Sequence, residues 1–236
     1  MHGVNPPALG CRAMTDRLRH LATAALASLA AGLAAVPLAA QTGAQTGAPY
    51  TVVETGRAYE RLQDAVNAIG DGAGTIRFAS LRFADCAVQT AGEVTYQAEV
   101  PGQAVLDGIA CEGKAALVLR GRSARIEGMT FANIRVADRN GAGVRLEQGN
   151  LSVTQSWFRD SEQGILTAND ARGDIAIDKS TFTRLGTREG YGGCAHSIYV
   201  GDYEGTLTVT RSRFPHGRGG GHPENRGPPG GVGGLS

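Results

Sequence analysis

Three side chains in the second half of the chain have the chemistry needed to act on an acidic polysaccharide. β-Elimination requires a group that neutralises the uronate carboxylate, a base for the adjacent proton and an acid for the leaving oxygen. Arg145 would hold the carboxylate, His196 would act as the base and Tyr199 as the acid. The alternative is structural, because a histidine in a glycine-rich turn commonly serves as a hydrogen-bonding partner for the backbone. We therefore predict Arg145, His196 and Tyr199 as candidate catalytic residues.

Three aspartates at nearby turns are candidate metal ligands, namely Asp170, Asp174 and Asp202. Carboxylate oxygens are the ligands that Ca²⁺ prefers, so calcium is the cofactor that this cluster would take. Turn aspartates also cap backbone N–H groups, which is the competing interpretation. No regular calcium-binding repeat is present, and no paired Cys or His spacing predicts a zinc site.

A glycoside hydrolase would instead need two facing carboxylates, and Glu127 and Asp178 are the candidates. The repeat described below places them two coils apart, with Thr154 between them. Neighbouring Arg125 and Lys179 favour ordinary surface ion pairs at both positions.

The segments that position these residues repeat along the chain. In each copy, two apolar residues separated by one spacer are followed, five positions later, by a phenylalanine. The copies span residues 124–131, 151–158, 175–182 and 207–214, and their phenylalanines, Phe131, Phe158, Phe182 and Phe214, are 27, 24 and 32 residues apart. A period of this length, with short strands and Gly/Asn/Asp turns, is typical of a parallel β-helix. A β-sandwich is the alternative, but it has no reason to repeat the same pattern of eight residues.

A second series of short apolar strands lies upstream of each copy, at residues 117–119, 144–146, 165–167 and 198–200. Side chains alternate along a strand, so the central residue of each should point outward. Arg145 and Tyr199 should then share one outer face, with Leu166 on the coil between them and strand steps of about 4.8 Å. His196 would reach that face from the preceding turn.

The N-terminal residues differ in composition from the rest of the 236-residue chain. A basic segment from Met14 to His20, an Ala/Leu run over residues 21–38 and small residues before Gln41 are typical of a secretory signal peptide. We predict a signal peptide over residues 1–40, with initiation at Met14, and a periplasmic or secreted protein without a membrane span after cleavage. A retained transmembrane anchor is the alternative, because the apolar run is about long enough to span a bilayer.

The remaining organisation follows from the same patterns. We predict a linker over residues 41–49, a β-helix over 50–214 and a disordered Gly/Pro-rich tail over 215–236. The helical period of residues 57–69, ending at Gly70, predicts a helix that caps the first coil.

Export would allow disulfide bonds to persist. Cys86 and Cys111 lie 25 residues apart, which is one coil length, so they are candidates for a disulfide. Cys194 would then be unpaired, as a small buried residue or, beside His196, as a reactive thiol. The net charge of +1, with scattered basic residues, argues against a nucleic-acid partner.

Residues 140–145, 164–166 and 194–201, together with the Ser-x-Phe coil endings, resemble exported bacterial right-handed parallel β-helix proteins of the pectate-lyase-like superfamily. The resemblance covers about residues 50–214. In that group a Gly-His-x-x-Lys-Ser-Arg segment leads into further coils, whereas here only residues 221–222 and 225–226 are similar to it. The resemblance therefore implies a truncated or frame-shifted chain.

Members of the superfamily include polysaccharide lyases and hydrolases, epimerases and adhesins. The resemblance implies a protein that acts on or binds polysaccharide, with lyase-like activity on acidic glycans as the first hypothesis. A non-catalytic module that binds glycan or forms part of the cell envelope is the alternative. The expected partner in both cases is a polysaccharide or cell-envelope glycan.

Overall fold

The computed structural model describes residues 47–169, 172–186, 196–202, 205–215 and 224–225, all within the compact unit Ala44–Ser236. The predicted signal peptide, most of the predicted linker, Asp170 and Cys194 lie outside the described residues. No helix in the described ranges is long and apolar enough to cross a membrane.

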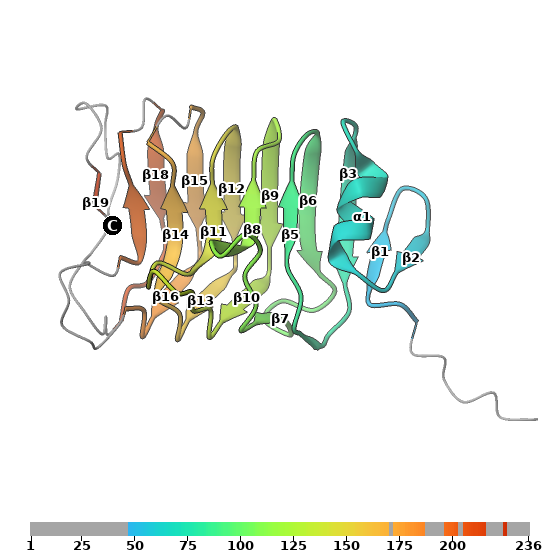
Figure 1. Cartoon of the computed structure of the whole chain (residues 1–236), viewed down its shortest axis with the longest axis horizontal. Coiled ribbons are helices and arrows are strands. Elements are labelled where there is room, and N and C mark those ends of the chain that lie inside the picture. Colours follow the sequence, from blue (N-terminus) through green and yellow to red (C-terminus); the bar gives the residue numbers. More distant parts are fainter. Residues whose placement is uncertain (1–46, 170–171, 187–195, 203–204, 216–223, 226–236) are drawn as a thin grey trace, which may run out of the picture. The chain divides into compact units, whose positions relative to one another are not determined.

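The described residues form three sheets, with one short helix (Figure 1). Sheet A has the order β18 (Leu207–Thr210), β15 (Ile175–Asp178), β12 (Asn150–Thr154), β9 (Ser123–Glu127), β6 (Glu93–Ala98), β3 (Ala73–Phe78), β1 (Tyr50–Val52), β2 (Arg57–Tyr59). Sheet B has the order β16 (Thr181–Thr183), β13 (Trp157–Arg159), β10 (Met129–Ala132), β7 (Ala104–Asp107), β4 (Arg82–Phe83). Sheet C has the order β19 (Glu224–Asn225), β17 (Ile198–Val200), β14 (Gln163–Thr167), β11 (Ala142–Leu146), β8 (Ala115–Leu119), β5 (Ala87–Gln89).

From β3 onward the chain visits sheets A, B and C in turn, and successive strands of each sheet pair in parallel (Figure 1). Within the described residues, antiparallel pairing between strands is confined to β1, which pairs with β2 and β3. The fold is therefore all-β and solenoid-like, as predicted. Buried side chains from all three sheets form one hydrophobic core.

The four phenylalanines of the repeat form a stack, with Phe131, Phe158 and Phe182 inside this core and Phe214 packed against it. The rings of Phe131, Phe158, Phe182 and Phe214 lie 4.8, 4.7 and 5.1 Å apart and are nearly parallel. Serines stand two residues before Phe158, Phe182 and Phe214 and form hydrogen bonds from coil to coil. The Ser156 hydroxyl accepts from the Met129 N–H at 3.2 Å, and the Ser180 hydroxyl accepts from the Ser156 N–H at 3.2 Å. Each serine thus satisfies a backbone donor on the preceding coil, which explains why a polar residue can repeat there.

Helix α1 (Leu62–Ile69) begins five residues later than predicted. The prediction of a helix from residue 57 was wrong because Arg57–Tyr59 pairs with β1 as strand β2. The Leu62 N–H donates to the Asp85 carboxylate at 2.8 Å, so a residue from the following coil satisfies the start of the helix. Its predicted end is confirmed at Gly70, which has a φ of 60°.

Two further outcomes concern the ends of sheet C. The predicted disulfide between Cys86 and Cys111 is present, with a Cα–Cα distance of 5.5 Å. Strand β19 pairs with β17, so the strand pattern continues past Phe214, where we predicted the start of a tail. The two-residue strand was missed because it has no apolar alternation to detect.

Candidate functional site

The three predicted catalytic residues lie on or beside the outer face of sheet C. The register pairs Arg145 with Leu166 and Leu166 with Tyr199, as the sequence predicted. Arg145 and Tyr199 are therefore two strand steps apart, or about 10 Å. The ring of Tyr199 packs against the small apolar cluster to which Leu166 belongs.

His196 lies next to Tyr199, at the start of β17. The two rings are 5.1 Å apart with a tilt of 40°, and the His196 residue is only 6% exposed. Its backbone is fixed on both sides, because its N–H donates to the Gln163 side-chain oxygen at 2.7 Å and its carbonyl accepts from Gly164. The structure thus brings His196 and Tyr199 together and leaves Arg145 at a distance from both.

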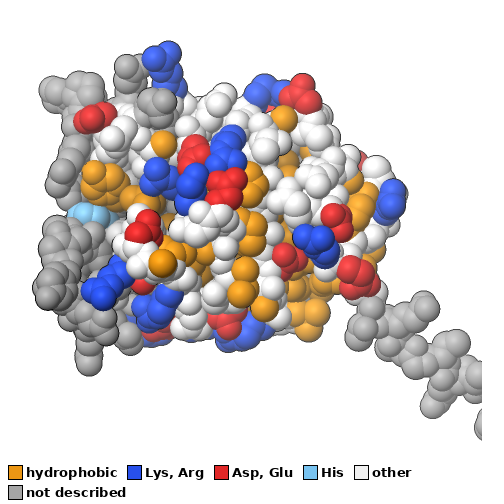
Figure 2. All heavy atoms as spheres, in the orientation of Figure 1, with side chains coloured by type: hydrophobic (Ala, Val, Ile, Leu, Met, Phe, Trp, Pro, Cys, Tyr) orange, Lys and Arg blue, Asp and Glu red, His pale blue; other side chains and the backbone are white. Residues whose placement is uncertain are grey.

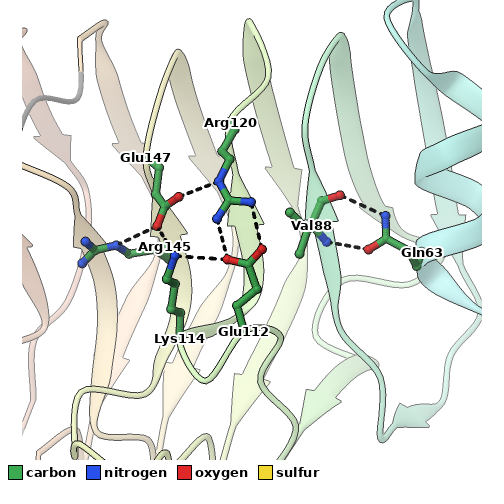
Figure 3. Close-up of polar contacts among 7 residues, drawn as sticks. All are labelled: Gln63, Val88, Glu112, Lys114, Arg120, Arg145 and Glu147. Atoms are coloured by element: carbon green, nitrogen blue, oxygen red, sulfur yellow. Dashed lines mark hydrogen bonds and ion pairs between the residues drawn. The ribbon is translucent and has the colours of Figure 1, made fainter.

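Arg145 belongs to a charged cluster that the sequence did not predict (Figure 3). Its Nε lies 3.6 Å from Glu147, which also accepts from Arg120 at 2.6 Å and from Lys114 at 2.8 Å. Arg120 and Lys114 bind Glu112 as well, Arg120 with one contact at 2.9 Å. We call these five residues the tether cluster, because Glu112 and Lys114 come from the loop that joins β7 to β8. No motif marks the cluster, since Glu147 lies 27 residues from Arg120 and 33 from Lys114.

The cluster shifts the ionisation of its carboxylates. Hydrogen bonds from Arg120, followed by those from Lys114, hold the pKa of Glu112 at about 2. Burial raises the pKa of Glu147, but hydrogen bonds from Lys114 and Arg120 outweigh it, so the net pKa is lowered. Both carboxylates are therefore ionised at neutral pH.

The same loop is attached to sheet C at a second point. Cys111, joined to Cys86, packs against a cluster formed by Ala115, Val118, Ala142 and Leu166. As a result Val118, which points outward from the sheet, is fully buried. Figure 2 shows Lys/Arg and Asp/Glu side chains together over the middle of this face, with hydrophobic side chains nearby. The β7–β8 loop thus covers the outer face of sheet C at β8, whereas charged side chains occupy this face at β11.

The predicted metal ligands are only partly described. Asp174 accepts from the Thr206 N–H at 3.2 Å, which is the capping role named as the alternative. Asp202 is exposed, and Asp170 lies outside the described residues. Within the described part of the chain, no group of three or more His, Cys, Asp or Glu residues is arranged to hold a metal ion. The calcium site therefore stays a prediction.

The two candidate hydrolase carboxylates make structural contacts. Glu127 and Asp178 lie two strands apart with Thr154 between them, as predicted. Glu127 accepts from Gln97 at 2.9 Å, and Asp178 accepts from Arg211 at 2.6 and 2.7 Å. Hydrogen bonds from Arg211 are the main cause of the lowered pKa of Asp178. Arg125 lies 3.9 Å from Glu127, so both carboxylates form surface ion pairs, the competing interpretation, although Asp178 pairs with Arg211 and not with the predicted Lys179.

A groove of about 740 Å³ lies elsewhere, on the outer face of sheet A. No sequence feature predicts this groove, because its hydroxyl-bearing and small side chains resemble those at any solvent-facing strand position. Its lining comes from β3, β6, β9, β12 and β15 and includes Thr75, Thr95, Arg125, Asn150, Ser152 and Ala176.

Comparison with protein-family models, with curated proteins and with solved structures finds no match to this chain. The resemblance to exported β-helix proteins, and the function that it implies, are accordingly proposals.

Proposed function

We propose that this chain is an exported right-handed parallel β-helix that binds an acidic polysaccharide on the outer face of sheet C. The regular A–B–C order of strands supports the β-helix, as does the similarity of the coil endings. The disulfide Cys86–Cys111 is in keeping with an oxidising compartment such as the periplasm or the exterior.

Helix α1 is proposed to cap the first coil. Its Gln63 side chain donates to the Val88 carbonyl at 3.0 Å and accepts from the Val88 N–H at 2.8 Å (Figure 3). These two bonds occupy the backbone groups of β5, the edge strand of sheet C. A side chain that pairs with an edge strand blocks the addition of another chain.

The observation that carries the binding proposal is the excess positive charge of the tether cluster, on the same outer face as Tyr199. The tether cluster contains three cations, Arg120, Lys114 and Arg145, but two carboxylates, Glu112 and Glu147. Arg145 makes the loosest of these contacts, at 3.6 Å, and its side chain is 24% exposed. A sugar carboxylate could therefore bind Arg145 while a sugar ring packs on Leu166 and Tyr199.

Oligogalacturonate binding to Arg145→Ala, measured by isothermal titration calorimetry, tests this proposal. Loss of a charge-assisted hydrogen bond should weaken binding about tenfold or more. Arg125→Ala, which removes an arginine from the face of sheet A, is the matched control and should bind as the wild type does. Equal affinity of the Arg145→Ala variant and the wild type would refute the proposed site.

A second candidate is β-elimination on the same polysaccharide, favoured by the 5.1 Å contact between His196 and Tyr199. This pair would provide the base and the acid, with Arg145 as the carboxylate clamp. The unsaturated product absorbs near the ultraviolet edge, so turnover of polygalacturonate can be followed directly. We expect His196→Ala to abolish the signal. Unchanged turnover would remove His196 from the mechanism, and binding without chain shortening would leave the non-catalytic proposal standing.

A further inference from the structure

The groove on sheet A has the size and position of a site for an extended ligand. Its volume of about 740 Å³ is in the usual range for ligand sites. It crosses strands β3, β6, β9, β12 and β15, which are successive neighbours in the sheet. Four steps of about 4.8 Å give a length of about 19 Å along the stack of coils. The groove therefore suits a short stretch of polymer better than a single small molecule.

Hydroxyl groups recur along this groove in one row. The register places Thr75 beside Thr95, Thr95 beside Arg125, and Arg125 beside Ser152, all with outward side chains. In the described residues, the hydroxyls of Thr95, Ser123 and Ser152 make no hydrogen bond to another part of the chain. They are half-buried, so a ligand with many hydroxyls could bind them by exchange of hydrogen bonds with water.

The charge of the lining argues against an acidic ligand. Three carboxylates, Glu54, Glu93 and Asp174, line the groove, compared with one guanidinium, that of Arg125. Backbone hydrogen bonding from Thr75 is the main cause of the lowered pKa of Glu54, so this group is ionised at neutral pH. A polyanion would meet like charges here, whereas an uncharged polyhydroxylated chain would not.

We propose that the outer face of sheet A is a second ligand site, which binds an uncharged glycan strand along the stack of coils. The site differs from the one on sheet C in its sheet, its residues and its net charge. Its ligand would be neutral, and its contacts would be made by hydroxyls, by the Asn150 amide and by Arg125 as a hydrogen-bond donor.

Ser152→Leu provides the test, because it fills the middle of the groove at an outward position. Thr208→Leu is the matched control, since Thr208 pairs with Ala176 at the same level of the sheet but does not line the groove. Binding to the full chain would be measured with neutral hexasaccharides of glucose, xylose and N-acetylglucosamine. Ser152→Leu should weaken binding about tenfold or more, while Thr208→Leu and Arg145→Ala leave it unchanged.

Hydrogen exchange of the wild type provides a readout that does not depend on the variants. The neutral hexasaccharide should protect peptides covering β6, β9 and β12 and leave β11 and β14 unchanged. Absence of binding across the neutral panel would overturn the proposal. So would protection confined to sheet C, or loss of oligogalacturonate binding in Ser152→Leu. The first two outcomes leave the acidic-glycan proposal standing, because it depends on Arg145, whereas loss of oligogalacturonate binding in Ser152→Leu would count against both proposals.

Discussion

The outer faces of sheets A and C are built by the same coils but are unlike each other. Sheet A presents an open groove of hydroxyls and small side chains, whereas sheet C presents aliphatic side chains and a charged cluster beneath a tethered loop. The inward residues of both sheets repeat from coil to coil, because the inward side chains of each coil must pack on those of the preceding coil. Outward positions have no such constraint, so the differences that can carry function gather there.

The turns explain which face receives a loop. From β9 onward, connections from sheet A to sheet B have one or two residues, with a positive φ at Gly128, Gln155 and Lys179. Connections from sheet B to sheet C are longer; the one between β7 and β8 carries Cys111 and Glu112. A loop long enough to fold back can therefore arise beside sheet C, whereas the tight turns after β9, β12 and β15 leave that part of sheet A open.

The largest expected effect comes from the corner that leads into sheet A. At Gly149, φ is +82°, and an added Cβ would lie 2.2 Å from the Gly121 carbonyl oxygen and 2.5 Å from that of Arg122. Because both atoms belong to the backbone, Gly149→Ala should lower the free energy of unfolding by about 3 kcal/mol or more. Chemical denaturation monitored by circular dichroism measures this change.

Gly108→Ala is the control for that experiment. Gly108 also has a positive φ, of 74°, but an added Cβ meets nothing within 4 Å. Its substitution should cost only about 1 kcal/mol, the cost of the backbone conformation alone. If the two variants are equally destabilised, the close approach of coils at the sheet A corner contributes nothing.

Removal of the disulfide should have the next largest effect, and its local part should be confined to sheet C. Cys86–Cys111 closes a separation of 25 residues, so the double variant Cys86→Ser/Cys111→Ser should lose about 3 kcal/mol of stability. Its local effect should be faster hydrogen exchange in β5 and β8, because the loop above them is released. Peptides from β9 and β12 should exchange through global unfolding alone. Equal local loss of protection in sheets A and C would show that the loop does not shield sheet C specifically.

The parts of this structure that sequence predicts are those that must repeat. Phe131, Phe158 and Phe182 fill equivalent inward positions, so their spacing reveals the stack and the register that places Arg145 and Tyr199 on one face. The tether cluster has no such signal, because Glu147 and Lys114 meet through the loop and not through the repeat.

The groove and the start of α1 were missed for related reasons. Outward hydroxyls such as Thr95 and Ser152 give the same alternation on any solvated sheet, so the sequence does not separate a groove from a plain surface. Residues 57–59 continue the helical period of the following segment, but pairing with β1 satisfies their backbone as a strand instead. Tertiary pairing thus overrides the local pattern at that point.

The smallest expected effect comes from removing a carboxylate that pairs with an arginine, either on sheet C (Glu112 with Arg120) or at the sheet A corner (Asp71 with Arg122). Glu112 has its pKa lowered from 4.5 to about 2, so its contribution to stability is complete above about pH 4.5 and is lost as pH falls through about 2. Glu112→Gln should therefore destabilise the protein near neutral pH and match the wild type at about pH 2. Since the Glu112 side chain is 38% exposed, the difference should be at most about 1 kcal/mol.

Asp71→Asn is the control, because Asp71 binds Arg122 at the sheet A corner but is 82% exposed and ties down no loop. Urea unfolding between pH 2 and 7 measures both variants. A difference for Glu112→Gln that persists at pH 2, or an equal pH dependence in Asp71→Asn, would show that charge at Glu112 does not hold the loop on sheet C.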